Sequence, residues 1–289
     1  MSGIMNGKRG LIMGVANERS IAWGIAKALH GAGAELAFTY QGDAFGKRLA
    51  PLAETVGSDF MVDVDVTDDA SIKAAIATVE RAHGSVGILI NNAGVGLMTP
   101  MEIVPIEDVR KQYETNVFGL LAVTQPAIAA MRQVGRGRIV NIGSSGGEFT
   151  TPTGGVYQAS KAAVNSMTDA MRMELKPFGI DVVLIEPGAI ASKFGKNGNV
   201  IMDENGPYAQ LMRGVDKITT QALEPDAPGT WTPEKVAKAV FHASTTRSPK
   251  TRYRPGFVAK LLIHLRAWLP DRMWDYMFMS QLTKAGKKN

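Results

Sequence analysis

A tyrosine and a lysine four residues apart are the side chains of this sequence best suited to acid–base chemistry. They are Tyr157 and Lys161, in the segment YQASK. In a helix this spacing places both on one face, where the lysine ammonium can stabilise a tyrosinate and lower the pKa of the phenol. Such a phenol can give a proton to, or take one from, the oxygen of a carbonyl or an alcohol. The alternative is an exposed helix surface, because this spacing arises often by chance.

Two further polar residues could complete such a site. Ser144 ends the apolar segment RIVNIGS, where its hydroxyl could bond the same substrate oxygen. Asn116 lies in YETNVFG, within a predicted helix in which Asn is not favoured, and could hold a water that links Lys161 to solvent. The chain has no Cys, which excludes disulfides and thiolate metal sites, and we predict no metal site.

The segment GVANERSIA, near the N-terminus, predicts a phosphate-binding loop between a strand and a helix. Gly14 can take the positive φ of a tight turn, and Ala22 is small enough for close packing of the helix on the strand. Ser20 suits the N-cap, where its hydroxyl can bond a helix N–H or a phosphate oxygen. The N–H groups of a helix N-terminus suit a pyrophosphate. On the loop alone, a plain turn is an equal alternative.

Residues after the second and third predicted strands could bind an adenosine. Asp65 could accept a hydrogen bond from the adenine amino group, and Val66 could pack on the ring. Gln41 lies at the position where an Asp or Glu would accept a hydrogen bond from the ribose 2′-hydroxyl. Lys47 and Arg48 could meet a 2′-phosphate, although a solvated helix face is the commoner explanation. These residues alone leave the choice between NAD and NADP open.

Short apolar segments alternate with helical ones along the chain. Strands are predicted near 9–14, 35–40, 59–65, 86–91, 137–143, 180–186 and 251–255, and helices near 20–31, 43–56, 68–83, 106–131, 157–177 and 233–246. This alternation predicts an α/β fold with a parallel sheet, and the nearly unbroken apolar strands indicate a sheet covered on both faces. We therefore predict one doubly wound sheet of about seven strands, with ligands beyond the C-terminal strand ends.

Two C-terminal regions depart from this alternation. Residues 188–232, rich in Gly, Asn, Pro and Asp, predict a substrate lid. Residues 257–289 predict an amphipathic helical extension to a dehydrogenase domain of residues 1–256, with Pro270 separating two helices. The predicted apolar stripes are Val258, Leu261, Leu262, Leu265 and Leu269, and then Met273, Trp274, Met277, Phe278 and Leu282. We favour packing within the chain over packing on a partner subunit or contact with a membrane surface.

Composition favours a soluble enzyme with an anionic cofactor over a nucleic-acid-binding protein. The 32 Lys and Arg exceed the 27 Asp and Glu only slightly, for a net charge of +5. No uninterrupted apolar run approaches the roughly 18 residues of a membrane span, and the N-terminus lacks the apolar core of a signal peptide. With no Cys, these features lead us to expect a cytoplasmic protein.

In this order, the motifs resemble those of the short-chain dehydrogenase/reductase family over nearly the whole chain. The resemblance implies a Rossmann-type fold, a nicotinamide cofactor, and a catalytic tetrad of Asn116, Ser144, Tyr157 and Lys161, in which the lysine also bonds the nicotinamide ribose. Ser192 stands where members of this family usually have a threonine that contacts the carboxamide. The cofactor-binding residues that it implies, together with those above, are Gly14, Ser20, Ile21, Gln41, Asp65, Val66, Asn92, Ala93, Gly94, Tyr157, Lys161, Pro187, Gly188 and Ile190.

The two parts of the chain resemble different branches of this family. Residues 5 to about 72, with the long Gly-x5-Ser-Ile-Ala loop, are similar to enoyl-acyl-carrier-protein reductases. From about residue 73 onward, ILINNAG, NVFG, NIGSS and YQASK resemble alcohol/ketone enzymes, and DAMRMELKPFGIDVVLIEPGAI resembles hydroxysteroid and retinol dehydrogenases. Enoyl reductases need Tyr-x6-Lys, whereas here the seventh residue after Tyr157 is Val164. We hypothesise a mosaic with a joint near residues 68–80; a divergent natural member is the alternative.

Chemistry follows the catalytic residues, so we predict interconversion of a lipophilic secondary alcohol and a ketone or aldehyde, with Tyr157 as general acid/base. An enoyl-thioester reductase and a catalytically inactive nucleotide-binding chimera are the alternatives. Gln41 resembles its counterpart in NADH-using enoyl reductases, which favours NAD(H) and leaves NADP(H) as the second choice. Helices 106–131 and 157–177 form dimer faces in this family, which implies a homodimer or homotetramer.

Overall fold

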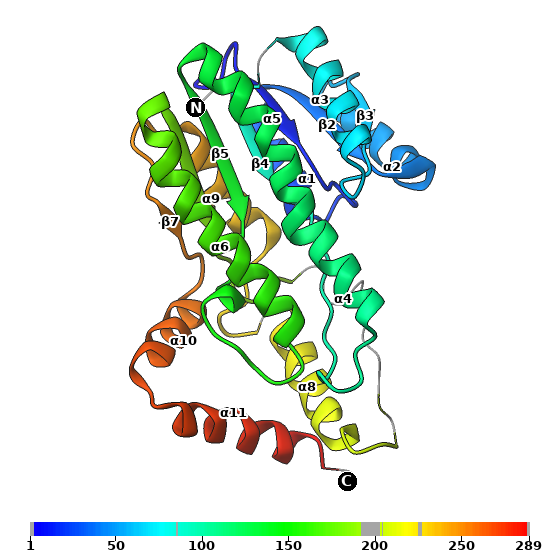
Figure 1. Cartoon of the computed structure of the whole chain (residues 1–289), viewed down its shortest axis with the longest axis vertical. Helices are drawn as coiled ribbons and strands as arrows, with labels where there is room; N and C mark the ends of the chain where they lie inside the picture. Colours follow the sequence, from blue (N-terminus) through cyan, green and yellow to red (C-terminus); the bar gives the residue numbers. More distant parts are fainter. Residues whose placement is uncertain (1–2, 85, 192–202, 204, 225–226, 288–289) are drawn as a thin grey trace.

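A seven-stranded parallel sheet forms the centre of the computed structural model (Figure 1), which describes residues 3–84, 86–191, 203, 205–224 and 227–287. The strands are β1 (Arg9–Ile12), β2 (Glu35–Tyr40), β3 (Met61–Asp63), β4 (Ile88–Asn91), β5 (Gly137–Ile142), β6 (Ile180–Ile185) and β7 (Arg252–Tyr253). Their order is β3-β2-β1-β4-β5-β6-β7, and all neighbouring pairs are parallel. The predicted doubly wound sheet is confirmed, and its order reverses between β1 and β4, where ligands of such sheets bind.

Helices cover both faces of the sheet and enclose two hydrophobic cores. One face carries α1 (Ile21–His30), α2 (Gly42–Thr55) and α9 (Pro233–Thr245), and the other carries α3 (Asp69–His83), α5 (Gly119–Val134) and α6 (Gly155–Leu175); α4 (Ile106–Tyr113) precedes α5 and packs against α6. Successive strand residues enter opposite cores: Leu89 joins the second core, whereas Ile90 joins the first. This alternation explains why the strands are apolar at almost every position.

The predicted helix over 106–131 is interrupted by a π-helical turn, Glu114–Phe118, between α4 and α5. By length and mean hydropathy (1.2), the helix Ile106–Val134 could cross a membrane, although charged and polar residues interrupt its apolar runs. However, Val123, Ala127 and Met131 lie in the second core. The apolar character of this helix is therefore explained by its packing on the sheet.

The predicted lid over 188–232 contains a helix, α8 (Ala209–Ala222), which its composition does not predict. One face of α8 packs against the C-terminal helix α11 (Asp271–Ala285): the carbonyl oxygen of Leu282 lies where a side chain at Gly214 would stand. This contact is made with a segment distant in sequence, so the local composition gave little sign of it. Residues 192–202, 204 and 225–226, including Ser192, lie outside the described residues.

The C-terminal extension forms α10 (Phe257–Trp268) and α11, separated at Pro270 as predicted. The extension packs within the chain through Ala259, Ile263, Trp274 and Leu282, and α11 runs across the lower end of the molecule in Figure 1. The stripe predicted for α10 is not its packing face, because Val258 and Leu261 are 40% and 43% exposed. An apolar stripe shows that a helix face is hydrophobic but does not show what covers it.

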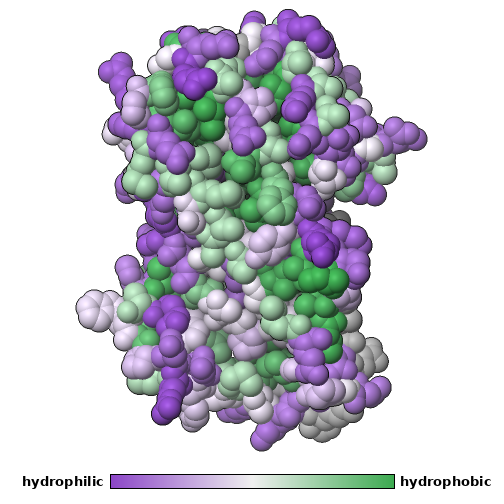
Figure 2. Space-filling model, viewed as in Figure 1, coloured by the Kyte–Doolittle hydropathy of each residue, from purple (hydrophilic) through white to green (hydrophobic). Residues whose placement is uncertain are grey.

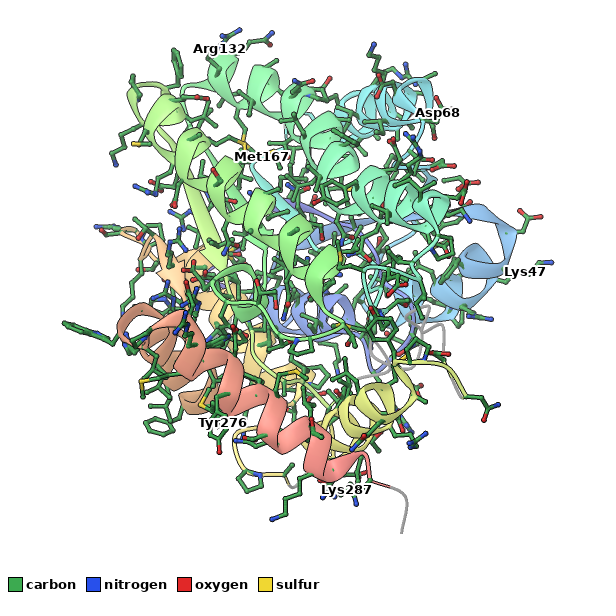
Figure 3. All side chains as sticks on the ribbon, turned by 60° about the horizontal axis from the view of Figure 1, so that its bottom comes forward. Lys47, Asp68, Arg132, Met167, Tyr276 and Lys287 are labelled. Carbon is green, nitrogen blue, oxygen red and sulfur yellow. The ribbon has the colours of Figure 1, made fainter. Side chains whose placement is uncertain are left out.

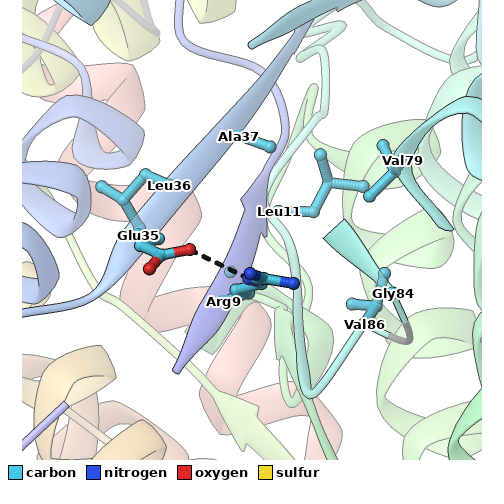
Figure 4. Close-up of a pocket in the computed structure, with 9 residues that line it drawn as sticks. Arg9, Leu11, Glu35, Leu36, Ala37, Val79, Gly84 and Val86 are labelled. Carbon is cyan, nitrogen blue, oxygen red and sulfur yellow. Dashed lines mark hydrogen bonds and ion pairs between the residues drawn. The ribbon is translucent and has the colours of Figure 1, made fainter. Parts of the chain in front are cut away.

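A small pocket lies at the amino ends of β1 and β2, at the edge of the sheet opposite the candidate site (Figure 4). Arg9 Nε donates to Glu35 Oε2 across its mouth at 2.9 Å. Its volume of about 20 Å³ is enough for little more than one water. This pocket is therefore too small for a substrate.

Candidate active site

Ser144, Tyr157 and Lys161 lie together at the carboxyl end of β5. Tyr157 and Lys161 occupy the first two turns of α6, and the Tyr157 hydroxyl is hydrogen-bonded to the side chain of Ser144. Lys161 is 5% exposed; its Nζ donates to the Ile142 carbonyl oxygen at 3.0 Å and lies 6.0 Å from the centroid of the Tyr157 ring. An ammonium has three N–H donors, so the bond to Ile142 leaves capacity for ribose hydroxyls.

The pKa of Tyr157 shifts in the direction opposite to the one we expected. Burial raises the pKa of its phenol, and the hydrogen bond with Ser144 lowers it by a smaller amount. Burial also lowers the pKa of Lys161 to about 8. Burial disfavours both charged forms, so the phenol stays protonated at neutral pH. The ammonium still carries its charge there, because its lowered pKa of about 8 remains above neutral pH.

The loop after Ser144 connects the catalytic residues to the predicted nicotinamide pocket. Ser144 Oγ accepts a hydrogen bond from Gly146 N at 3.0 Å, and Ser145 N donates to the Pro187 carbonyl oxygen at 2.9 Å. A Cβ at Gly188 would lie 2.9 Å from the Cβ of Ala259 in α10, so this turn requires glycine. Ile190, in the same segment, forms a β-bridge with Trp231.

Asn116 lies in the π-helical turn, and its amide is committed to protein partners. Its Oδ1 accepts from Val95 N at 2.9 Å, and its Nδ2 donates to the Val95 carbonyl oxygen at 3.0 Å and to Ser160 Oγ at 3.0 Å. Both N–H donors are therefore used. The amide thus fastens the turn after β4 to α6, while Oδ1 keeps a second lone pair, so a water held there for Lys161 stays a prediction.

Ser160 is a buried residue of this cluster that the sequence analysis missed. In addition to Asn116, it accepts a hydrogen bond from Gln112 Nε2 at 3.3 Å, and it donates to the Tyr157 carbonyl oxygen at 2.7 Å. A serine inside a helix, directly before Lys161, was a signal that could have identified it. Ser160 joins α4, the π-helical turn and the first turn of α6.

The loop after β1 and the turn after β4 approach each other closely enough to require glycine. Gly14 has a φ of +75°, and a Cβ there would lie 3.0 Å from the Ala93 Cα; Asn92 Nδ2 donates to the Met13 carbonyl oxygen at 3.4 Å. A Cβ at Gly94 would lie 3.5 Å from Lys161 Nζ. A dinucleotide crossing these strand ends would meet backbone rather than side chains, which fits the predicted cofactor.

Ser20 is the N-cap of α1, as predicted. Its Oγ accepts from Trp23 N at 3.2 Å and donates to the Asn17 carbonyl oxygen at 2.7 Å. Ile21 opens the helix and is half-buried, and Ala22 is fully buried against the first core. The hydroxyl of Ser20 is thus occupied by the cap, and the backbone N–H groups of the first turn are the donors available for a phosphate.

Gln41, Asp65 and Val66 meet beyond the ends of β2 and β3. Hydrogen bonds from Thr67 lower the pKa of Asp65 below its ordinary value, burial opposes them, and a bond with Gln41 adds to the lowering. Val66 is partly buried against the second core. The predicted adenosine residues therefore form one cluster, with an ionised carboxylate as the acceptor for an amino group.

A network of acidic and basic side chains lies next to the site, between α6 and β7. Glu186, fully buried, is hydrogen-bonded to Glu148, and both accept from Arg252 Nη1. Asn165 Nδ2 donates to the same two carboxylates, at 3.2 and 3.1 Å. Burial and the bond with Glu148 raise the pKa of Glu186 to about 7, although Arg254 opposes this shift. The two carboxyl groups therefore share one proton over the acidic range.

Comparison with known proteins places this arrangement in a family. The family model described as "Enoyl-(Acyl carrier protein) reductase" matches residues 14–216. A 3-ketodihydrosphingosine reductase from Bacteroides thetaiotaomicron is 33% identical over 78% of this chain and 83% of its own length. An NADPH-dependent 3-dehydrocapnine reductase from Ornithobacterium rhinotracheale is 36% identical over 76% of this chain and 79% of its own.

An NADH-dependent enoyl-[acyl-carrier-protein] reductase from Rhizobium meliloti is 37% identical over 68% of this chain and 74% of its own. Among solved structures, a short-chain dehydrogenase from Streptomyces avermitilis has a TM-score of 0.76 and 25% identity, over 97% of this chain and 99% of its own. By the matched model and these relatives, the chain belongs to the short-chain dehydrogenase/reductase family and is an NAD(P)-dependent oxidoreductase.

Proposed function

We propose that the enzyme interconverts a lipophilic ketone and its secondary alcohol, with Tyr157 as the general acid and base. The observation that carries this proposal is the hydrogen bond between Tyr157 and Ser144, with Lys161 on the next turn of α6. The position that would hold the lysine of an enoyl reductase is Val164, which is fully buried in the second core. A charged side chain could not occupy that position without a large desolvation cost.

The nicotinamide, when bound, supplies or accepts the hydride at the carbonyl carbon. In the reductive direction the Ser144 hydroxyl holds the substrate oxygen, and the Tyr157 hydroxyl donates its proton to that oxygen. The Lys161 ammonium stabilises the tyrosinate that remains and has N–H groups for the ribose hydroxyls. In the oxidative direction Tyr157 removes the proton from the alcohol. Asn116 and Ser160 hold the turn after β4 and α6 in position for these steps.

The assay that tests the proposal follows cofactor consumption with a panel of lipophilic ketones and with crotonyl thioester. We expect turnover of ketones, and loss of nearly all of it in Tyr157→Phe, because the phenyl ring has no proton to donate. Cofactor affinity, measured by fluorescence titration, should remain in that variant. Turnover of the enoyl thioester alone, or substantial ketone reduction by Tyr157→Phe, would contradict the assignment.

The names of the relatives support a ketone substrate without identifying it. One is named a reductase of 3-ketodihydrosphingosine and another of 3-dehydrocapnine. The match covers about four fifths of the length of each relative. The enoyl-thioester alternative is favoured by the description of the family model and by the relative from Rhizobium meliloti. The thioester arm of the assay decides between the two.

We also propose a preference for NAD(H) over NADP(H). Two carboxylates flank the position of an adenosine ribose: Asp65 bonds Gln41, and Asp63 Oδ1 accepts from Gly42 N at 2.9 Å. A 2′-phosphate would be repelled by these charges. Lys47 offers little compensation, since its side chain, on the second turn of α2, points away from the body of the molecule (Figure 3).

Steady-state kinetics with both cofactors test this preference. We expect a higher kcat/KM with NADH, and a shift toward NADPH in Gln41→Arg, whose guanidinium would pair with the phosphate. A tenfold preference of the unmodified enzyme for NADPH would contradict it.

The mosaic hypothesis places a joint in or beside α3, near residues 68–80. It is supported by the sequence motifs quoted above, and α3 separates two complete strands, so an exchange there would leave each strand intact. Replacing residues 1–75 by those of an NADPH-dependent ketone reductase should change the cofactor preference and leave the order of preferred substrates unchanged. A changed substrate order would count against two separable halves.

A further inference from the structure

We propose that α10 and α11 form a docking surface for the face of an anionic membrane. The proposal does not rest on the ketone reductase function, because binding to a bilayer requires no turnover. It rests on the exposed apolar face of α10, on the positive charge of the C-terminal segment, and on the place of both helices beside the site.

The outward face of α10 is mainly apolar, with the exposed His264 among its residues. Ala259 and Ile263, one helical turn apart, are the buried residues of this helix. The opposite side presents Phe257, Leu261 and Trp268, which are 74%, 43% and 86% exposed. A surface helix normally turns its polar side to water, so this arrangement is the reverse of ordinary amphipathic packing. Large exposed aromatic and aliphatic side chains on one helix face are typical of helices that lie in a membrane interface.

The C-terminal segment is also strongly basic. Residues 257–289 hold six Lys and Arg against two Asp and Glu, and so carry four of the five net positive charges of the chain. Lys260 on α10 and Arg272 and Lys284 on α11 are exposed. In Figure 2, hydrophilic and hydrophobic residues alternate over the lower left of the molecule, where Figure 1 places these helices. Apolar side chains bordered by cations complement a bilayer of anionic lipids.

The outward side of α11 extends this surface. Met273 and Tyr276 are 56% and 75% exposed, and Figure 3 shows Tyr276 and Lys287 along the outer side of α11. Tyrosine and tryptophan prefer the level of the lipid headgroups, where a ring and a polar group are both accommodated. The two helices therefore present aromatic, aliphatic and basic groups together, whereas an interface between protein subunits is usually depleted in Lys.

The docking surface is linked to the active site by direct contacts of α10 and α11. Trp274 Nε1 of α11 donates to the Thr150 carbonyl oxygen at 3.0 Å, in the loop that begins at Ser144, and the Trp274 ring lies 5.6 Å from that of Phe149. Beyond this, α10 contacts the turn at Gly188, and α11 packs on α8. A membrane bound to α10 and α11 would thus lie against the elements that surround the substrate.

Co-sedimentation of the full-length enzyme with vesicles tests the proposal. The vesicles are phosphatidylcholine alone and phosphatidylcholine with phosphatidylglycerol, each at low and high salt. We expect binding to the anionic vesicles at low salt and weaker binding at high salt. As a second measurement, the Trp268 emission should shift to the blue with anionic vesicles, and Trp268→Phe should lose this shift, because Trp268 is 86% exposed whereas Trp23 and Trp274 are buried and Trp231 is partly buried.

Matched variants separate a specific surface from general stickiness or charge. Leu261→Ser/Trp268→Ser should abolish binding, whereas Ile4→Ser/Phe45→Ser, which removes apolar groups that are 55% and 41% exposed elsewhere, should retain it. Lys260→Gln/Arg272→Gln/Lys284→Gln should weaken binding by about 100-fold at low salt, at roughly fivefold per cation. The control Lys47→Gln/Lys73→Gln/Lys111→Gln removes the same charge at other exposed positions and should bind as before.

Three results would overturn the proposal. The unmodified enzyme could remain in the supernatant with every vesicle. The two charge variants could lose binding equally, which would show a general effect of net charge. Finally, the unmodified enzyme could be an oligomer that does not bind vesicles, and light scattering could show that Leu261→Ser/Trp268→Ser dissociates it. That result would mean that a second copy of the chain covers this face. The Trp268 emission of the unmodified enzyme remains decisive if a variant fails to fold.

Discussion

Lys161 is the residue whose ionisation should govern the pH dependence of the reaction. Its pKa is lowered to about 8, whereas the pKa of Tyr157 is raised, so the lysine is the group that loses its charge first as the pH rises. We expect kcat/KM for ketone reduction to fall as the pH passes about 8, because the neutral amine no longer stabilises the tyrosinate. A pH–rate profile between 6 and 10 measures this, and a profile that is flat to pH 10 would contradict it. If Lys161→Arg retains activity, its alkaline decline should begin at a higher pH.

Gly14 is a second residue at which a single added atom, a Cβ, should change stability and cofactor binding. Gly14→Ala places a Cβ against the Ala93 backbone in addition to straining a positive φ, whereas Gly57, with a φ of +62°, has open space around it. We expect Gly57→Ala to cost only the left-handed strain of about 1–2 kcal/mol. Gly14→Ala should lower the thermal midpoint further and weaken cofactor binding, as measured by thermal unfolding with and without NADH. Equal effects of the two substitutions would show that the loops after β1 and β4 need not approach closely.

At the scale of elements, the shared proton of Glu148 and Glu186 joins β6 and β7 to α6. The pKa of Glu186 is about 7 in the folded chain, against an ordinary value of 4.5, so the folded state holds the proton more tightly than the unfolded state. The stability that this provides is complete below about pH 4.5 and is lost as the pH rises through about 7. The groups facing Glu186 are Glu148, Arg252, Arg254 and Asn165.

Glu186→Gln tests this network, because the amide keeps the shape of the protonated acid and cannot titrate. We expect the free energy of unfolding of the unmodified enzyme, relative to that of Glu186→Gln, to decline between pH 5 and 7 and to level off above that. Urea unfolding at pH 5, 6, 7 and 8 measures the difference. Parallel stability curves for the two proteins would show that Glu186 does not retain its proton.

At the scale of the whole molecule, we propose that the enzyme is a dimer or tetramer built on α4, α5 and α6. Phe118, in the π-helical turn before α5, and Met173 on α6 are 54% and 65% exposed, at the surface that the family resemblance marks as a dimer face. Met173→Glu should yield a monomer by light scattering, because it would bury a charge in that interface. Phe45→Glu, on α2, is the control and should leave the assembly intact. A monomeric unmodified enzyme would contradict the proposal.

The sequence by itself determined the order of the elements and the identity of the central site residues. Strand and helix signals are local, and the carboxyl ends of parallel strands meet at one edge, so the side chains after β1 to β6 had to converge there. For this reason Gly14, Gln41, Asp65, Tyr157 and Lys161 could be assigned to one region before any fold was known. The turn at Pro270 and the cap at Ser20 were local signals of the same kind.

Only the tertiary structure decided how these groups are solvated and what each apolar face touches. The pKa of Tyr157 rises because burial outweighs the hydrogen bond with Ser144, and the Asn116 amide is hydrogen-bonded to Val95 and Ser160. The exposed stripe of α10 and the helix in the predicted lid depend on contacts between segments distant in sequence. Helical periodicity identifies an apolar face, but the partner of that face, and the dielectric around a charge, are set by the packing of the whole chain.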